Sequence, residues 1–306
     1  MRILITGASG FLGGHLCRQL EKNGHELVML NSSNCDLRDS RSLGAISHQT
    51  YDRIYHLAAW TQAGDFCLHH PGEQWIINQQ INTNVLTWWQ ASQPQAKLIA
   101  MASSCCYPED GDLVEERFFH GTPTPSLFTY AMTKRMLCAG LQALNTQYRL
   151  SYLCLIPSTL YGPDYHLKGR QLHFIFDLIR KIVKASRGGE PPVLWGDGNQ
   201  IRELLHVQDF VTATLRLSDN VSNELINVGS GQGKSIRWFA ERICEVVGYD
   251  PAHIHYDTSK YVGAKSKVLS VKKLHTLLPV FTPISEEKGI KEVVSWYLGT
   301  QFAARK

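Results

Sequence analysis

A tyrosine and a lysine four residues apart could carry acid–base chemistry in this chain. Tyr130 and Lys134 stand in the sequence Tyr-Ala-Met-Thr-Lys, and a spacing of four places both side chains on one face of a helix. A nearby ammonium stabilises a phenolate and lowers the pKa of a tyrosine from its reference of about 10. Such a tyrosine can exchange a proton with a carbonyl or an alcohol near neutral pH. An ordinary pair on a helix surface is the alternative, and the spacing alone favours it.

A second candidate group follows the β-rich run 97–102. A serine at the carboxyl end of a parallel strand lies at the rim of a cofactor cleft, where Ser103 could hydrogen-bond the same oxygen atom as Tyr130. Cys105 comes two residues later, and a thiolate there could take a proton from carbon. The alternative for Cys105 is a small apolar core residue, the usual place of a free cysteine.

A glycine motif near the start of the chain predicts a dinucleotide site. Three glycines directly follow the β-rich run 2–6 and open a helical pattern. Glycine allows a sharp turn and a close approach to a pyrophosphate, and the helix N-terminus supplies free N–H groups and a positive dipole end. The motif alone is a weak indication, and its place between a strand and a helix strengthens it. The expected cofactor contacts in this loop are Gly7, Ser9, Gly10, Phe11, Leu12 and Gly13.

The residues at the end of the second β-rich run, 26–30, should decide between NAD(H) and NADP(H). An acidic residue there would accept hydrogen bonds from the ribose hydroxyls and repel a 2′-phosphate. The run is followed by Asn31 and two serines instead, which tolerates the phosphate but supplies no arginine to bind it. NADP(H) is therefore favoured, and NAD(H) stays open. Asp36 and Leu37 lie where an adenine edge could be read, with a loop turn or a helix cap as the alternative for Asp36.

These residues need a parallel sheet whose strands end at one cleft. Strand-like runs alternate with helical patterns in the first half of the chain, which predicts βαβ units with right-handed crossovers. The expected strands cover 2–6, 26–30, 53–57, 97–102 and 151–156, with a late strand and turn at 226–229, and the expected helices cover 10–23, 79–91, 130–147, 173–185 and 235–247.

The predicted fold class is therefore α/β, a Rossmann doubly wound parallel sheet with a smaller C-terminal substrate-binding lobe. Residues 1–162 would mainly form the NAD(P)-binding domain. Residues 163–306 would mainly form the lobe, with the segment at about 203–234 returning to the first domain. The regular alternation weakens after residue 162, so the pattern does not fix this boundary.

The composition argues against several other classes of protein. The 306 residues are 43% hydrophobic and 19% charged with a net charge of +4, which suits a sizeable core. The charge is mild and no basic block is present, so nucleic-acid binding is not expected. No run approaches the ~18 apolar residues that span a membrane. Eight cysteines without a CxxC pair argue against a metal site and for a cytoplasmic location with reduced thiols.

The order of these motifs resembles that of the extended short-chain dehydrogenase/reductase family, whose members are nucleotide-sugar epimerases, dehydratases and reductases. Small residues, Leu57-Ala58-Ala59, stand between the glycine loop and the serine that precedes the Tyr-x-x-x-Lys pair. Within that family the chain is most similar to the GDP-L-fucose synthases, and the resemblance covers nearly the whole chain. The sequences that carry this closer resemblance are Ser103–Pro108, Leu160–Pro163, Leu194–Gly198 and Arg202–Val207.

The resemblance implies an NADPH-dependent enzyme acting on a GDP-4-keto-6-deoxy-hexose, which it would epimerise at carbons 3 and 5 and then reduce at carbon 4. Ser103 and Tyr130 would hold the ketone oxygen, with Tyr130 as proton donor, and Lys134 would bind the nicotinamide ribose. Cys105 matches the base of the epimerisation. His173 matches the acid that reprotonates the opposite face, which suits a pKa near 7; a partly buried helix histidine is its alternative.

At the nucleotide end, Trp195 and Arg202 match positions that line the GDP site. Lys267, and one of Arg180 or Lys181, match cations near the diphosphate. Arg202 precedes Glu203, so an ordinary ion pair is its alternative. By analogy with the fold, a homodimer would form through the helices at 79–91 and 130–147. The remaining expected contacts are Ser104 and Thr159 to the substrate and Leu57, Ala58, Ala59 and Ile156 to the cofactor.

Four departures from the family pattern bear on the sugar and the cofactor. Thr159 replaces an asparagine, Ser9 replaces an arginine of the glycine loop, 261–263 replaces a Pro-Asp-Gly turn, and the loop 60–65 differs from a glycine-rich version. A related GDP-linked deoxy-hexose or heptose is therefore an open alternative. So is a carbon-4 reductase, or a carbon-4 epimerase that retains NAD. A non-catalytic NAD(P)-binding sensor would be expected to lack Tyr130 or Lys134.

Overall fold

A six-stranded sheet forms the centre of the computed structural model, which describes residues 1–63, 66–167, 171–260 and 263–303. The strands lie in the order β10-β5-β4-β3-β1-β2 and all their pairings are parallel. The doubly wound sheet predicted from the sequence is thereby confirmed. The strand order reverses between β1 and β3, and sheets of this kind bind ligands at that point. The strands are β1 (Arg2–Thr6), β2 (Glu26–Leu30), β3 (Arg53–His56), β4 (Lys97–Met101), β5 (Tyr152–Pro157) and β10 (Glu224–Val228).

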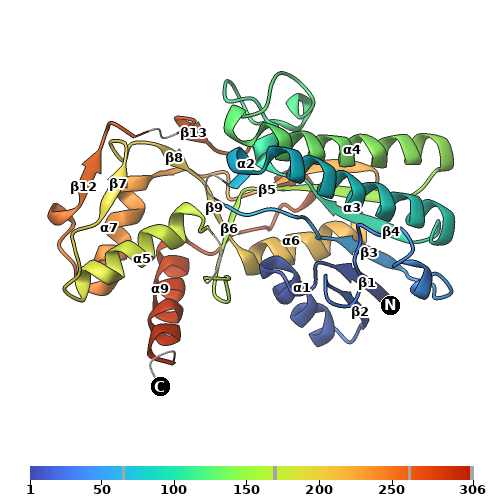
Figure 1. Ribbon diagram of the computed structural model, residues 1–306, viewed down its shortest axis with the longest axis horizontal. Coiled ribbons are helices and arrows are strands. Elements are labelled where there is room, and N and C mark those ends of the chain that lie inside the picture. Colours follow the sequence, from blue (N-terminus) through green and yellow to red (C-terminus); the bar gives the residue numbers. More distant parts are fainter. Residues whose placement is uncertain (64–65, 168–170, 261–262, 304–306) are drawn as a thin grey trace.

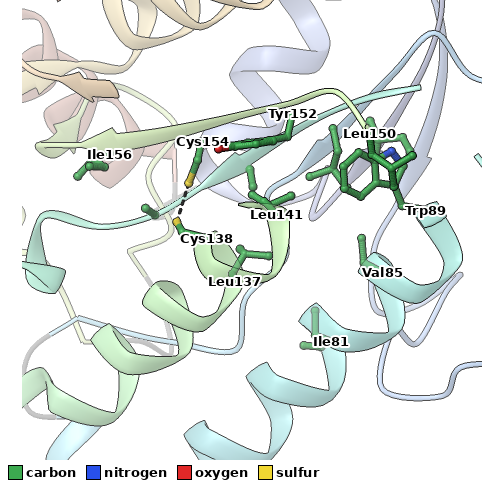
Figure 2. Packing of buried hydrophobic residues seen from close by; sticks show 14 of the residues in the cluster. Ile81, Val85, Trp89, Leu137, Cys138, Leu141, Leu150, Tyr152, Cys154 and Ile156 are labelled. Atoms are coloured by element: carbon green, nitrogen blue, oxygen red, sulfur yellow. Dashed lines mark hydrogen bonds between the residues drawn. The ribbon is translucent and has the colours of Figure 1, made fainter. Parts of the chain in front are cut away.

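Helices cover both faces of this sheet, which is why its inner strands are almost continuously apolar. α3 (Pro71–Ser92) and α4 (Phe128–Tyr148) lie on one face, and α1 (Phe11–Lys22) and α6 (Val207–Asn220) lie on the other (Figure 1). Figure 2 shows the first of these layers, where side chains of α3 and α4 gather under β5. A short helix, α8 (Lys272–Leu277), packs beside β10, and α2 (Phe66–His69) precedes α3.

The second body stands beside the sheet and has its own core (Figure 1). Its helices α5 (Phe174–Ser186), α7 (Ile236–Val247) and α9 (Glu286–Ala303) pack together. Two small sheets complete it, β7 (Val193–Trp195) with β12 (His255–Asp257), and β8 (Ile201–Arg202) with β11 (Lys234–Ser235) and β13 (Ser266–Lys267). Between the bodies, β6 (Thr159–Tyr161) pairs with β9 (Leu204–His206).

The expected elements of the first half are found with small shifts of their ends. The largest shift is at α3, which begins at Pro71 rather than at residue 79. The sequence analysis did not predict α6 or α9. The division into two domains at residue 162 stays a prediction. Among the helices of the described segments, none has the length and apolarity that crossing a membrane requires.

Candidate active site

The glycine loop lies between the carboxyl end of β1 and the start of α1. Gly7 has a φ of +70°, and a Cβ there would stand 2.8 Å from the backbone nitrogen of Ala58. A Cβ on Gly13 would stand 2.2 Å from the carbonyl oxygen of Gly7. No side chain of the described residues caps α1 at Gly10, so the first N–H groups of the helix face the loop. This cradle fits the diphosphate of a dinucleotide.

The other expected cofactor residues border this loop with different exposure. Ser9 is exposed, and Phe11 and Leu12 are half-buried at the start of α1. The backbone N–H of Ala58 donates to Oγ1 of Thr6 at 3.2 Å, which fixes the small residues Leu57, Ala58 and Ala59 beside the glycines. Ile156 is fully buried in the core of the sheet.

The loop after β2 is closed by its own side chains. Oδ1 of Asn31 accepts from the backbone N–H of Ser33 at 2.8 Å. Nη2 of Arg38 donates to Asp36 at 2.7 Å, and the hydrogen bonds from this side chain are the main cause that lowers the pKa of Asp36 to about 2. Leu37 is buried. Asp36 therefore takes the role of a turn residue, and its contact with an adenine stays a prediction. The sequence analysis found no arginine at this end, yet Arg38 lies in the same loop.

Ser103, Tyr130 and Lys134 meet where β4 ends against α4. Oγ of Ser103 accepts from the backbone N–H of Cys105 at 3.2 Å, which starts the 3-10 turn Ser104–Cys106. The side chains of Ser103 and Tyr130 share a hydrogen bond. Nζ of Lys134 lies 5.9 Å from the centre of the Tyr130 ring and donates to the carbonyl oxygen of Met101 at 2.8 Å. The structure thus brings Ser103, Tyr130 and Lys134 together, with Cys105 beside Ser103.

Burial sets the protonation of this group. Loss of hydration raises the pKa of Tyr130 well above its usual value, and the hydrogen bond with Ser103 acts in the opposite direction. Loss of hydration also lowers the pKa of Lys134, which is 5% exposed. The lowered tyrosine pKa expected from the spacing is therefore wrong for this arrangement, because burial is the largest influence on the phenol. Tyr130 keeps its proton at neutral pH, as a proton donor must.

Lys267 contacts Cys105 and acts electrostatically on His173. Nζ of Lys267 lies 3.2 Å from Sγ of Cys105, which is half-buried. His173 is the N-cap residue of α5 and is exposed. Loss of hydration, and then the ammonium of Lys267, lower the pKa of this imidazole. The value near 7 expected for a reprotonating acid is therefore not retained.

A polar stripe on α3 was missed by the sequence analysis. Gln74, Asn78 and Asn82 are spaced by four and are all buried. Asn82 joins the ring of His56, through Oδ1 at 3.1 Å, to the carbonyl oxygen of Thr133 on α4. The signal that could have found these three amides was their spacing of four, which places them on one face of the helix.

The other two amides of the stripe hold the loop that follows β3. Asn78 accepts from the backbone N–H of Trp60 and donates to its carbonyl oxygen, both at 2.9 Å. Nε2 of Gln74 donates to Sγ of Cys67 at 3.3 Å. After loss of hydration, Cys105 contributes to the raised pKa of Cys67, and Cys67 contributes to the raised pKa of Tyr130. A second thiol therefore faces the candidate site, and nothing in its sequence context indicated this.

The residues expected at the nucleotide end stand mostly on the smaller body. Trp195 of β7 is 60% exposed. Lys181 contacts Asp177 at 3.0 Å, and Arg180 pairs with the same carboxylate. Arg202 of β8 donates to the carbonyl oxygen of Ala264 at 2.8 Å.

Two further expected substrate residues lie nearer the sheet, Thr159 on β6 and the buried Ser104. Ser104 and Lys267 line a small cavity. Beside it, a cavity of about 890 Å³ lies between Glu109–Val114 and the segment 263–272. Two of the departures from the family pattern lie partly outside the described residues. These are 64–65 of the loop 60–65 and 261–262 of the segment 261–263.

Comparisons with known proteins agree with this geometry. The sequence model of the NAD dependent epimerase/dehydratase family matches residues 3–229. The chain is 31% identical to the GDP-L-fucose synthase of Escherichia coli (strain K12), an alignment that covers 98% of this chain and 97% of that protein. It is 28% identical to the GDP-L-colitose synthase of Yersinia pseudotuberculosis, over 97% of this chain and 98% of that one.

A solved structure extends the likeness to three dimensions. A GDP-L-fucose synthetase from Naegleria fowleri bound to NADP superimposes with a TM-score of 0.86 and 27% identity, covering 100% of this chain and 96% of that one. The resemblance found in the sequence is thereby confirmed.

Proposed function

Because this chain belongs to the NAD dependent epimerase/dehydratase family, we propose that it inverts the carbons beside the ketone of a GDP-linked 4-keto-deoxy sugar and then reduces that ketone with NADPH. It is an NAD(P)-dependent enzyme of the nucleotide-sugar epimerase/reductase type. The single observation that carries the finer proposal is the position of Cys105, which lies two residues from Ser103 and faces Tyr130. A reductase alone would not need a thiol at that place.

The reduction would use Ser103, Tyr130 and Lys134. When bound at the glycine loop, NADPH supplies the two electrons that reduce the ketone. The protonated phenol of Tyr130 hydrogen-bonds the ketone oxygen and donates its proton as negative charge develops there. Ser103 orients the phenol and the ketone together. An ammonium has three donors, so Lys134 can bind the nicotinamide ribose while it holds the carbonyl oxygen of Met101.

The epimerisation would use Cys105 and His173. A ketone acidifies the C–H bonds beside it, so a thiolate at Cys105 can remove that proton and leave an enolate whose oxygen Tyr130 hydrogen-bonds. His173, on α5, would return a proton to the opposite face. Since its pKa is lowered, its protonated form is scarce at neutral pH but is a strong acid when formed. Inversion without reduction is the outcome that Cys105 and His173 would produce alone.

The choice of NADPH and of a GDP sugar is supported by the similar proteins. One of them was solved with NADP, and others carry the names of GDP-L-fucose and GDP-L-colitose synthases. Within this chain, the loop after β2 carries Asn31 rather than an acid, which leaves room for a 2′-phosphate. The exposed indole of Trp195 offers a flat surface for a base.

The exposed surface of α3 and α4 supports a second copy of this chain as the partner, in a homodimer. Ile76 on α3 and Met136 on α4 are 57% and 46% exposed, and the two helices pack side by side. Exposed apolar side chains on adjacent helices are suited to a two-fold contact with a second copy of the same surface.

NADPH oxidation with matched sugar nucleotides tests the substrate class. The purified protein is given GDP-4-keto-6-deoxy-mannose, and its UDP counterpart serves as the control. We expect oxidation of NADPH with the GDP sugar and a specificity constant, kcat/KM, at least about tenfold lower with the UDP sugar, because guanine contacts are lost. Equal values would contradict the GDP assignment. Oxidation with neither sugar would contradict the proposed substrate.

A further inference from the structure

The turn 103–107 presents only two of its side chains to the candidate site. Ser103 and Cys105 are half-buried, whereas the other three residues of the turn are buried. Oγ of Ser103 accepts from the backbone N–H of Cys105 at 3.2 Å, and the carbonyl oxygen of Ser103 accepts from the backbone N–H of Cys106 at 3.0 Å. The path of the backbone through this turn therefore decides where the hydroxyl of Ser103 and the thiol of Cys105 lie.

A buried guanidinium holds this turn from the side of α4. Arg135 is 7% exposed, and its Nε donates to the carbonyl oxygen of Cys106 at 3.0 Å, to which Nη2 donates as well. The same group donates to the carbonyl oxygens of His120 at 2.7 Å and Gly121 at 2.8 Å. A guanidinium presents its N–H donors in fixed directions within one plane. Arg135 therefore joins the turn to the loop 118–121 in one geometry.

The helix α4 thus holds the backbone on both sides of the two candidate groups. Nζ of Lys134 donates to the last carbonyl oxygen of β4, two residues before Ser103. Arg135, the next residue of the helix, binds the carbonyl oxygen of the residue that follows Cys105. Because the same helix carries Tyr130, these two contacts set the distance between the turn and the phenol.

The end of the turn is attached to the central sheet by a separate contact. The hydroxyl of Tyr107 donates to Oδ1 of Asn227 at 2.7 Å, and both side chains are buried. Asn227 belongs to β10, and its Nδ2 donates to the carbonyl oxygen of Leu113 at 2.8 Å. Without Arg135 the turn would remain attached to β10 but would lose a contact that fixes it to α4. The expected effect is a shift of the turn rather than the loss of the fold.

We propose that Arg135 is a positioning residue, which places Ser103 and Cys105 against the phenol of Tyr130 by binding the turn 103–107 to α4. The reaction of these side chains with a sugar ketone rests on the proposed function. A displacement of about 1 Å at a reacting group can lower a rate by about 10²-fold. The glycine loop follows β1, which β3 separates from β4, so the affinity for NADPH should not depend on Arg135.

Amide hydrogen exchange tests the contact without any substrate. Exchange in the peptide that contains 103–107 is measured by mass spectrometry in the full-length protein, for wild type, Arg135→Lys and Arg149→Lys. We expect Arg135→Lys to speed this exchange at least about tenfold, because hydrogen bonds from a charged planar group are lost. Arg149→Lys makes the same change at the exposed C-cap of α4 and should behave as wild type. Equal exchange in Arg135→Lys and wild type overturns the proposal.

Kinetic measurements separate positioning from a purely structural role. With NADPH and GDP-4-keto-6-deoxy-mannose, we expect kcat of Arg135→Lys to fall by about 10²-fold, while the dissociation constant for NADPH is unchanged. Exchange of deuterium from D2O into the sugar should slow by a similar factor, because one turn carries both candidate groups. All rates are measured where urea unfolding shows each variant to be folded. A lower free energy of unfolding with unchanged kcat would show a structural role only and overturn the proposal.

A second variant and the wild type complete the test. If Arg135→Lys does not fold, Arg135→Gln, which keeps planar N–H donors on a shorter side chain, takes its place with the same expected results. Unfolding of both variants would show a structural role only and would overturn the proposal. If wild type neither oxidises NADPH nor exchanges deuterium while amide exchange at 103–107 depends on Arg135, the proposed function fails and the positioning of the turn stands.

Discussion

Tyr130 and Lys134 share one face of α4, yet burial acts on them in opposite senses. The phenol is harder to ionise and the ammonium easier to deprotonate than in water. The pair therefore does not work as a phenolate stabilised by a neighbouring cation. Tyr130 is better understood as a protonated donor to the ketone oxygen, oriented by Ser103, and Lys134 as a cation that ties α4 to the end of β4.

Removing the hydroxyl of Tyr130 should abolish reduction and leave the nucleotide site intact. Tyr130→Phe deletes the proton donor, and general acid catalysis of this kind contributes about 10²–10⁴-fold. We expect kcat for NADPH oxidation to fall by that factor while the affinity for NADPH measured by fluorescence changes little. Tyr148→Phe makes the same chemical change at an exposed position of the same helix and serves as the control. Unchanged turnover in Tyr130→Phe would contradict the mechanism.

The sequence predicted residues that lie close together in the chain and missed partners that lie far apart. Tyr130 with Lys134, and Ser103 with Cys105, have fixed local spacings that follow from a helix and from the end of a strand. The contact of Lys267 with Cys105 spans 162 residues and depends on how β13 pairs with β8. Cys67 on α2 contacts Gln74 of α3, a contact that no spacing indicates.

At the scale of elements, α3 joins the sheet to α4 through buried amides. Asn82 bridges His56 at the end of β3 and Thr133 of α4. Thr6 of β1 contacts the other nitrogen of His56 at 2.8 Å. The chain of contacts runs from the strand that carries the glycine loop to the helix that carries Tyr130, so it fixes the cofactor cradle relative to the proton donor.

Asn82→Ala should destabilise the protein because it leaves the ring of His56 and the carbonyl of Thr133 without their partner. An unsatisfied buried polar group costs about 1–3 kcal/mol. We expect the free energy of unfolding in urea to fall by that amount. Gln80→Ala removes an exposed amide from the same helix and should change it little. Equal losses in the two variants would contradict a stabilising role of the bridge.

The raised pKa of the Glu203 carboxyl should make the free energy of unfolding depend on pH. Burial raises its pKa from 4.5 to about 7, against the hydrogen bonds from Leu269 and Gly231. The folded state thus binds this proton more tightly than the unfolded state, so the contribution is fully present below about pH 4.5 and is lost as the pH rises through about 7. Relative to Glu203→Gln, which does not titrate, wild type should lose on the order of 3 kcal/mol of unfolding free energy between those pH values.

The measurement is urea unfolding of wild type and Glu203→Gln at several pH values. The exposed Glu190 provides the control, because Glu190→Gln should follow wild type at every pH. A constant difference between wild type and Glu203→Gln across the range would contradict the raised pKa.

The elements that could be predicted are those with an unambiguous pattern. The inner strands are short apolar runs between turns, and they were found within one residue or so of their ends. α3 was predicted eight residues short because apolar and aromatic side chains occur around most of its surface, so no single face indicates where it begins at Pro71. α6 and α9 were missed, although α6 has buried residues on one face only. The strands of the smaller body have two or three residues, too few for an alternating pattern.

At the scale of the whole molecule, the two bodies are joined beside the cofactor cradle. Nε2 of His15 on α1 contacts the carbonyl oxygen of Pro163 at 3.0 Å, and Gln208 of α6 contacts its other nitrogen at 2.9 Å. Arg18 of α1 pairs with Asp164 at 2.8 Å. The chain that leaves the sheet for the smaller body is therefore attached to the helix that begins at the glycine loop.

The exposed apolar surface of α3 and α4 predicts a dimer contact. Acidic side chains introduced into this contact should disrupt the dimer. A double variant, Ile76→Asp with Met136→Asp, would bury two carboxylates in the contact. Since a central interface residue contributes about 2 kcal/mol or more, sedimentation should show a weakened dimer, with Kd raised by roughly a hundredfold. Val280→Asp alters an apolar residue that is 77% exposed elsewhere and should leave the dimer intact. A monomeric wild type would contradict the prediction.

The central claim is that one pocket performs both inversion and reduction, and a single reaction in D2O tests it. The protein is incubated with GDP-4-keto-6-deoxy-mannose and NADPH, and the product is analysed by NMR. The account predicts GDP-L-fucose with deuterium at carbons 3 and 5, and loss of that label with Cys105→Ser. A reduced sugar of unchanged configuration without deuterium would contradict it, since Tyr130 would then act in reduction while Cys105 and His173 had no part in the chemistry.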